Sequence, residues 1–208
     1  MENKEILKEL FRCAELYHEN LEGRSILLIS SNNSLSRISA VEAAFGPSNF
    51  LHLTGVKFEK GAEISPSVFY SRCLNRRLSA SQFILAEDGT TELKLSVLPE
   101  IFGSKHLSAK MIGDFHDRRQ ALFTDKLAGN IRCCVGLVFN SDQKVYVPNT
   151  VLKTDMRDSI KNQQRIILTY RKSIDDGQYS ELVYKAKNIS WSRVSLPPEF
   201  SYINLPAE

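Results

Sequence analysis

A histidine and a threonine stand two positions apart in an otherwise apolar stretch, FLHLTGV at residues 50–56. If this stretch is a strand, Leu51 and Leu53 share one face, and His52 and Thr54 share the other. An imidazole can exchange a proton near neutral pH, because the pKa of histidine is about 6.5. The stretch is therefore either a strand that merely buries its leucines or one wall of a site that presents His52 and Thr54 to a substrate.

Other segments also carry polar side chains where a strand or helix would present them together. Thr124 and Lys126 share one face of LFTDKLAGN, which spans residues 122–130. Further candidates in strand-like or helical segments are Tyr70, Tyr146, Asn149, Thr150, Lys153, Tyr170 and Arg171. The same residue types also have structural uses, because threonine favours strands and exposed lysine and arginine are ordinary on strand faces.

These groups match the requirements of RNA cleavage without a metal ion. One group takes the proton of the ribose 2′-hydroxyl, and a second protonates the leaving 5′-oxygen. A cation stabilises the charge that develops on the phosphorane, a role that suits Lys126 or Arg171. Histidine suits the base or the acid role, and threonine, tyrosine or asparagine can orient non-bridging oxygens.

Several other chemistries lack their sequence signatures. The chain has no GxxxxGK[ST], no GxGxxG after a strand, no HExxH and no GxSxG. Its four cysteines have no CxxC spacing and read as buried thiols, and its acidic residues are spread along helix faces and turns. We therefore expect no metal and no cofactor.

Length and composition indicate a globular protein of ordinary type. The chain has 208 residues, of which 42% are hydrophobic and 25% charged, with a net charge of +3. This mild basicity permits a nucleic-acid partner without requiring one. The first residues are too charged for a signal peptide, and no run reaches the roughly 18 apolar residues of a membrane span. We expect a cytoplasmic protein that does not engage a membrane.

The pattern of elements predicts an α+β fold with helices first and a mostly antiparallel sheet after them. We expect a single domain over residues 1–190, in preference to a boundary near residue 105, and an extended tail over 191–208. Predicted helices span 3–21, 65–78 with Ser65 and Pro66 at its start, 79–85, 90–102, and 152–161 with a Thr154 cap. Predicted strands span 25–30, 50–56, 131–139, 144–149, 164–173 and 180–189, and 36–45 is a strand or a short helix, with the strand favoured.

Several phrases together resemble a known family. They are FLHLTGV, SPSVFYSRCL, MIGDF, LFTDKLAGN, CVGLVF, YVPNTVLKTDMRD and IILTYRK. The chain from about residue 24 to 188 is similar to a phage- and mobile-element-associated family. This family is classed among the barnase–EndoU–colicin–RelE-like (BECR fold) nucleases, as their fourth phage group. The phrases HLTG and YVPNTVLK are the most specific parts of the resemblance.

The resemblance implies N-terminal helices followed by a curved antiparallel sheet of about four strands, here with helical insertions. It also implies a metal-independent endoribonuclease that leaves 2′,3′-cyclic phosphate ends and serves as a phage effector or toxin with RNA as its partner. Its motifs carry over His52, Thr54, Lys126 and Thr150 as catalytic candidates and Tyr70, Asn149 and Lys153 as substrate-binding candidates. Arg171 joins the substrate-binding set on grounds of charge.

Two other functions remain open. The first is a non-catalytic member of the same fold that binds nucleic acid or a protein, for instance as an inhibitor of a host defence system. The protein partners to consider are an antitoxin and a host protein. Alternatively, the same strands could hold a nucleotide or a nucleotide-modified protein as the substrate of a different enzyme.

Overall fold

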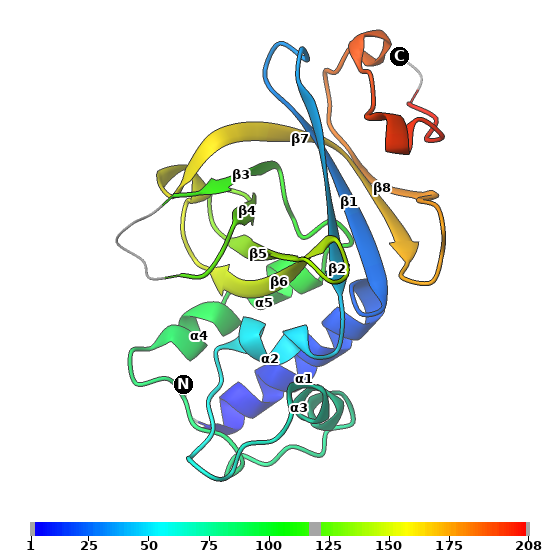
Figure 1. The fold of residues 1–208 in the computed structure, drawn as a ribbon. Coiled ribbons are helices and arrows are strands. Elements are labelled where there is room, and N and C mark those ends of the chain that lie inside the picture. Colours follow the sequence, from blue (N-terminus) through cyan, green and yellow to red (C-terminus); the bar gives the residue numbers. More distant parts are fainter. Residues whose placement is uncertain (1–2, 117–121, 207–208) are drawn as a thin grey trace.

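The computed structural model describes residues 3–116 and 122–206. Its helices are α1 (Asn3–Asn20), α2 (Asn49–Thr54), α3 (Pro66–Leu74), α4 (Thr90–Leu95) and α5 (Leu98–Phe102). Its strands are β1 (Arg24–Ser31), β2 (Ile38–Phe45), β3 (Met111–Phe115), β4 (Lys126–Gly129), β5 (Cys134–Asn140), β6 (Val145–Leu152), β7 (Ile160–Ser173) and β8 (Glu181–Lys185). The predicted mixture of N-terminal helix and β-sheet is confirmed (Figure 1).

The sheet closes into a barrel instead of the expected curved sheet of about four strands. Seven strands follow one another in the order β1-β2-β6-β5-β4-β3-β7, and β7 pairs back onto β1. All of these pairs are antiparallel except β2 with β6, which meet in parallel at Ala43 and Tyr146. The 14-residue β7 makes closure possible, because its first part pairs with β3 and its later part pairs with β1. Strand β8 adds to β7 outside the ring.

Strand β1 is apolar on both faces because each face packs against a different core. Ile26 and Leu28 point into the barrel and join the main core, which also contains the buried faces of all five helices. Leu27 and Ile29 point outward and join a second core. This explains why SILLIS lacks the alternation of a strand with one solvated face.

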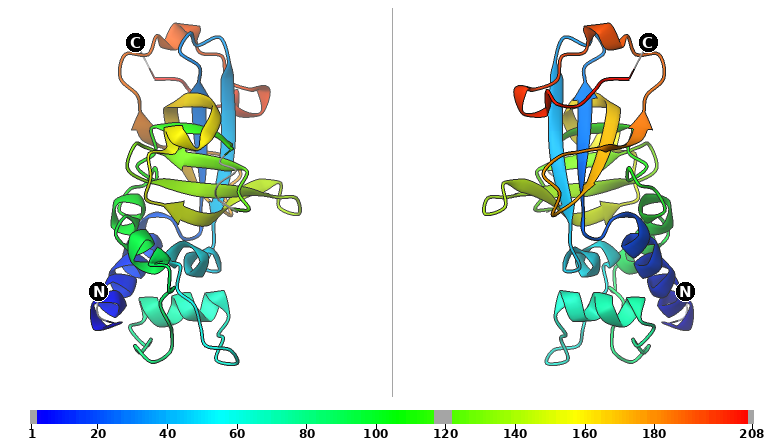
Figure 2. Two further views of the ribbon diagram at one scale, coloured as in Figure 1. Left: turned by 90° about the vertical axis from the view of Figure 1, so that its left-hand side faces the viewer. Right: turned by 90° about the vertical axis from the view of Figure 1, so that its right-hand side faces the viewer.

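The helices gather at one end of the barrel, and the C-terminal segment lies at the opposite end (Figures 1 and 2). Helix α1 presents its buried residues at helical spacing. The C-terminal segment covers the outer face of β1 and β7 with Trp191, Phe200 and Ile203, and it includes the short 3₁₀ turns Trp191–Arg193 and Pro198–Phe200.

Three other predicted helices are wrong in whole or in part. Residues 79–85 form turns and a single bridge between Ile84 and Lys57, not a helix. The predicted helix 90–102 breaks into α4 and α5, because Pro99 has no amide hydrogen to continue the helical ladder. Residues 152–161 run from the end of β6 to the start of β7, and the helical structure between these strands is the 3₁₀ turn Met156–Asp158, which Asp155 caps in place of Thr154.

No helix among residues 3–116 and 122–206 combines the length and apolar character needed to cross a bilayer.

Candidate active site

The stretch FLHLTGV forms a helix, α2, and not the predicted strand. Phe50 and Leu53 follow a helical spacing and are fully buried, whereas His52 lies on the exposed side. Thr54 is also buried, and its hydroxyl donates a hydrogen bond of 2.8 Å to the carbonyl oxygen of Leu51. His52 and Thr54 therefore do not share a face. The Thr54 hydroxyl instead makes hydrogen bonds to the backbone at the end of the helix.

Gly55 ends α2 and brings it close to α4. Its backbone has a left-handed φ of 71°, and its carbonyl oxygen accepts a hydrogen bond of 2.8 Å from the hydroxyl of Thr91. A Cβ atom on Gly55 would lie 2.9 Å from Cδ of Lys94. Glycine is required here both by the backbone conformation and by the lysine stem that crosses it.

Lys94 reaches from α4 over this turn to α2. Its Nζ donates a hydrogen bond of 3.0 Å to the backbone carbonyl oxygen of His52. Burial lowers the pKa of Lys94 from 10.5 to about 8, and the nearby Asp88 carboxylate only partly opposes the shift. A partly buried lysine with a lowered pKa beside an exposed imidazole is a pattern typical of functional sites.

Two adjoining hollows meet at Thr90 and Lys94, and we call them together the helix–barrel groove. The first, of about 380 Å³, is lined by α2 and the segments around it, and the second, of about 410 Å³, lies against β6. The residues lining the first hollow include His52, Lys57 and Asp88, and those lining the second include Leu122, Thr150 and Lys153. Each hollow is within the size range of small-molecule sites.

On the barrel side of the groove, Thr150 and Lys153 are available to a ligand. Thr150 is 6% exposed, and its hydroxyl makes no hydrogen bond to another described residue. Lys153 is exposed and has no ion pair within the described ranges. Gly136 on the neighbouring strand makes room for Thr150, because a Cβ atom there would lie 2.6 Å from its methyl group.

Asn149, next to Thr150, is engaged in holding the segment before β4. Its Oδ1 accepts a hydrogen bond of 2.8 Å from the Thr124 hydroxyl, and its Nδ2 donates to the carbonyl oxygen of Phe123. The amide of Asn149 thus holds the chain beside the groove, and both of its polar atoms are already occupied.

The remaining candidates lie elsewhere. Tyr70 is buried among the aromatic rings of the helical core, and its hydroxyl donates to Glu22. Arg171 is 8% exposed and pairs with Glu181, while its Nη1 donates to the carbonyl oxygen of Asn20.

Lys126 lies in a different pocket, at the mouth of the barrel, where it pairs with Asp114. The structure therefore places His52 in one of the two adjoining hollows and Thr150 and Lys153 in the other, and it leaves the remaining candidates outside both.

Sequence reasoning missed Lys94. Nothing in TTELKL distinguishes this lysine from any solvated residue on a helix, since its surroundings come from α2. The only available signal was Gly55, since a glycine after a short apolar run indicates a left-handed turn or a close approach of another chain segment.

The titratable groups of the described residues include no cluster of three or more His, Cys, Asp or Glu side chains that could hold a metal ion. All four cysteines are buried free thiols, as predicted. Burial raises the pKa of Cys133 to about 11 and that of Cys73 to about 12, so neither thiol is activated as a nucleophile.

Comparison with models of known protein families gives a match over most of the chain. The model of a family described as phage-Barnase-EndoU-ColicinE5/D-RelE like nuclease4 matches residues 9–188. This match covers most of the chain and confirms the resemblance seen in HLTG and YVPNTVLK. No curated protein and no solved structure matches the chain.

Proposed function

The chain belongs to this family of phage-type nucleases, and from that premise we propose that it cleaves RNA without a metal ion in the helix–barrel groove. One observation carries the proposal. His52 and Thr150, from the two phrases most specific to the family, line adjoining hollows that meet at a lysine with a lowered pKa. The groove thus combines a proton acceptor, a partly buried cation and an unoccupied hydroxyl.

The proposed reaction is an internal transfer at phosphorus. The imidazole of His52 takes the proton of the ribose 2′-hydroxyl, and the 2′-oxygen attacks the adjacent phosphorus. The bond from phosphorus to the 5′-oxygen breaks, and that oxygen receives a proton from the Lys94 ammonium. The products are a 2′,3′-cyclic phosphate and a free 5′-hydroxyl. DNA lacks the 2′-hydroxyl, so it cannot be cleaved by this mechanism.

Lys94 suits two parts of this reaction. At neutral pH its ammonium is largely protonated, since its pKa is about 8, and it can stabilise the charge on the phosphorane. Its lowered pKa also makes it a better proton donor than an exposed lysine, because a catalytic acid works best near the operating pH. The hydrogen bond to the His52 carbonyl oxygen fixes the ammonium close to the proposed base.

The charge of the groove supports a polyanionic substrate. Lys57, Lys94 and Lys153 line it, and Asp88 is the carboxylate among its described lining residues. Three lysines against one aspartate leave a positive groove that attracts phosphate groups. Lys153 can contact a neighbouring phosphate while Thr150 donates to a non-bridging oxygen.

The test is cleavage by full-length protein after exhaustive treatment with chelator. We expect cleavage of RNA but not of DNA, and a loss of about 100-fold or more on His52→Ala, the usual scale for a general base. His18→Ala is the matched control, because His18 is an exposed histidine that pairs with Glu22 at the end of α1. Equal activity of the His52→Ala and His18→Ala variants would refute the proposed role of His52.

A second candidate is binding of nucleic acid without cleavage. The observation that favours it is the single imidazole among the described groove residues, because metal-free cleavage needs two proton-transfer groups and would here depend on Lys94 as the second. Salt-dependent RNA binding by the wild-type chain, with no cleavage of any RNA, would support this alternative over the nuclease.

The phage association in the family's description supports a further part of the proposal, namely that the chain acts as a phage or mobile-element effector. Growth arrest on expression in bacteria, relieved by His52→Ala, is the expected result.

A further inference from the structure

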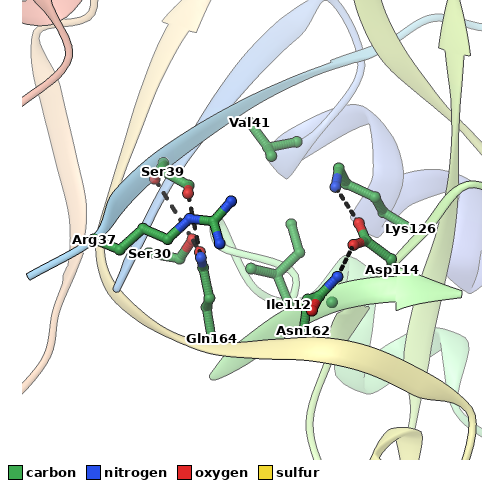
Figure 3. A pocket seen from close by; sticks show the side chains of 10 residues that line it. Ser30, Arg37, Ser39, Val41, Ile112, Asp114, Lys126, Asn162 and Gln164 are labelled. Carbon is green, nitrogen blue, oxygen red and sulfur yellow. Dashed lines mark hydrogen bonds and ion pairs between the residues drawn. The ribbon is translucent and has the colours of Figure 1, made fainter. Parts of the chain in front are cut away.

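The inward-facing residues of the barrel change from apolar to polar along five of its seven strands. On β1, Ile26 and Leu28 face the core and Ser30 follows them; on β2, Val41 faces the core beside Ser39. The same change occurs from Ile112 to Asp114 on β3, from Ala128 to Lys126 on β4, and from Ile166 to Gln164 on β7. The polar ends form a pocket at the mouth of the barrel (Figure 3). The pocket therefore belongs to the architecture of the barrel, because five strands each contribute a polar residue at the same end of the barrel.

One wall of this mouth pocket is held by a network around Asp114. The Lys126 ammonium and the Asn162 amide both donate to its carboxylate, from β4 and β7 respectively. These hydrogen bonds, with the positive charges of Lys126 and Arg37, hold the pKa of Asp114 below its usual value. The aspartate charge is thereby balanced by Lys126, which keeps two further N–H donors.

The opposite wall consists of Arg37 and a chain of neutral donors. Ser30 donates to Gln164 at 2.7 Å, and Gln164 in turn donates to Ser39 at 3.3 Å, which leaves the Ser39 hydrogen free to point elsewhere. The Arg37 guanidinium extends over the pocket toward the Lys126 side (Figure 3). Within residues 3–116 and 122–206, its guanidinium has no hydrogen bond or ion pair.

The pocket has room for one small group. Its volume is about 110 Å³, against the 300 Å³ or more of typical small-molecule sites, so a nucleoside does not fit. With Arg37 and Lys126 positive and Asp114 negative, the net charge of the pocket is +1. Donors stand on two opposite walls. A tetrahedral anion offers oxygens to both walls, whereas a planar carboxylate satisfies only one of them.

We propose that the barrel-mouth pocket binds a single phosphate group, held by a two-pronged contact from Arg37 and by the Lys126 ammonium. The phosphate is either inorganic phosphate or the terminal phosphate of an RNA chain. This site is separate from the helix–barrel groove, and it does not depend on the chain being a nuclease.

The test is titration of the full-length protein with inorganic phosphate, followed by calorimetry or by amide NMR shifts. We expect saturable binding that Arg37→Ala weakens about tenfold or more, because charged hydrogen bonds from the guanidinium are lost. Arg37 is exposed, and its guanidinium makes no hydrogen bond or ion pair to a described residue, so we expect the Arg37→Ala variant to keep its fold. Arg77→Ala is the matched control, since Arg77 is also an exposed arginine and lies just beyond the end of α3.

A comparison of RNA oligonucleotides identifies the source of the phosphate. The His52→Ala background prevents cleavage, and the two ligands are one short RNA with and without a 5′-phosphate. Tighter binding of the phosphorylated RNA, lost on Arg37→Ala, supports the site and assigns it to an RNA terminus. Equal binding of both RNAs, with inorganic phosphate still dependent on Arg37, supports the site for free phosphate.

Three results would overturn the proposal. The first is the absence of saturable phosphate binding at millimolar concentrations, and the second is phosphate binding that Arg37→Ala and Arg77→Ala weaken equally. Acetate that binds as well as phosphate would also overturn it, since the argument depends on a tetrahedral anion. RNA plays no part in the titrations with inorganic phosphate and acetate, so failure of the phosphate site there is distinguishable from failure of the proposed nuclease.

Discussion

Replacing Lys94 by methionine should make the protein more stable and less active at once. Lowering the lysine pKa from 10.5 to about 8 corresponds to about 3 kcal/mol that the folded protein loses by burying the charge. Methionine fills the same space with an uncharged chain. The variant also loses the hydrogen bond to the His52 carbonyl oxygen, which offsets about 1 kcal/mol. We expect a net gain of about 2 kcal/mol at pH 7, or roughly 4–8 °C in Tm for a chain of this size.

The gain in stability of the Lys94→Met variant over the wild type should decrease as the pH rises. The unfolded chain binds the lysine proton more tightly than the folded one, so wild-type stability rises as pH increases from about 8 to 10.5. The advantage of Lys94→Met is therefore complete below pH 8 and disappears by pH 10.5. Wild-type cleavage should fall above pH 8 for the same reason, because the ammonium loses its proton.

The assay is urea unfolding at a series of pH values, together with RNA cleavage at pH 7. Lys60→Met is the control, since Lys60 is exposed and has no described partner. It should change neither stability nor cleavage appreciably. A Lys94→Met variant that is less stable than wild type at pH 7 would refute the argument from burial. A stabilised variant with full cleavage activity would instead remove Lys94 from the mechanism.

Two further predictions concern neighbouring positions. Gly55→Ala should lower the free energy of unfolding, measured in urea, by about 2 kcal/mol. Alanine disfavours a φ of 71°, and its Cβ would lie 2.9 Å from Cδ of Lys94. A change below about 0.5 kcal/mol would contradict this prediction. Thr150→Val removes the hydroxyl of a residue that lines the groove and keeps the shape of the side chain. RNA cleavage should therefore fall about tenfold while the unfolding midpoint stays the same, and unchanged cleavage would exclude Thr150 from the site.

The local elements were largely predictable from the sequence, whereas the closure of the barrel was not. The strand SILLIS and the helix after Ser65 follow from apolar runs and a capping residue, and Ser65 does accept a hydrogen bond from the amide of Val68. Closure depends on β1 pairing with β7 and on β2 pairing with β6, about 100 residues or more apart in the chain. No local periodicity encodes such pairs.

The error at FLHLTGV has a specific cause. Four apolar residues around one histidine fit both a short strand and a short helix, because a run of this length does not separate the two periods. What decides for the helix is its surroundings. The side chain of Asn49 accepts a hydrogen bond from the amide of Gly46 just before the helix, and Gly55 ends it in a left-handed turn.

The candidate site was predictable only in part for the same reason. His52, Thr150 and Lys153 stand out as polar residues in specific phrases, but their relation to Lys94 arises from the packing of α4 against α2 and β6. Three other candidates also stand out in the sequence but do not line the groove, because their polar groups bind other parts of the protein. They are Thr54, Tyr70 and Arg171.

The most direct test of the proposed function is the chemistry of the cut ends. Mixed RNA is incubated with chelator-treated protein, and the fragments are analysed by mass spectrometry. The proposed mechanism predicts 2′,3′-cyclic phosphate and 5′-hydroxyl ends, and no cut at a position where a single 2′-deoxynucleotide replaces the ribonucleotide. Fragments with 5′-phosphate ends, or cleavage at the 2′-deoxy position, would contradict attack by the 2′-hydroxyl.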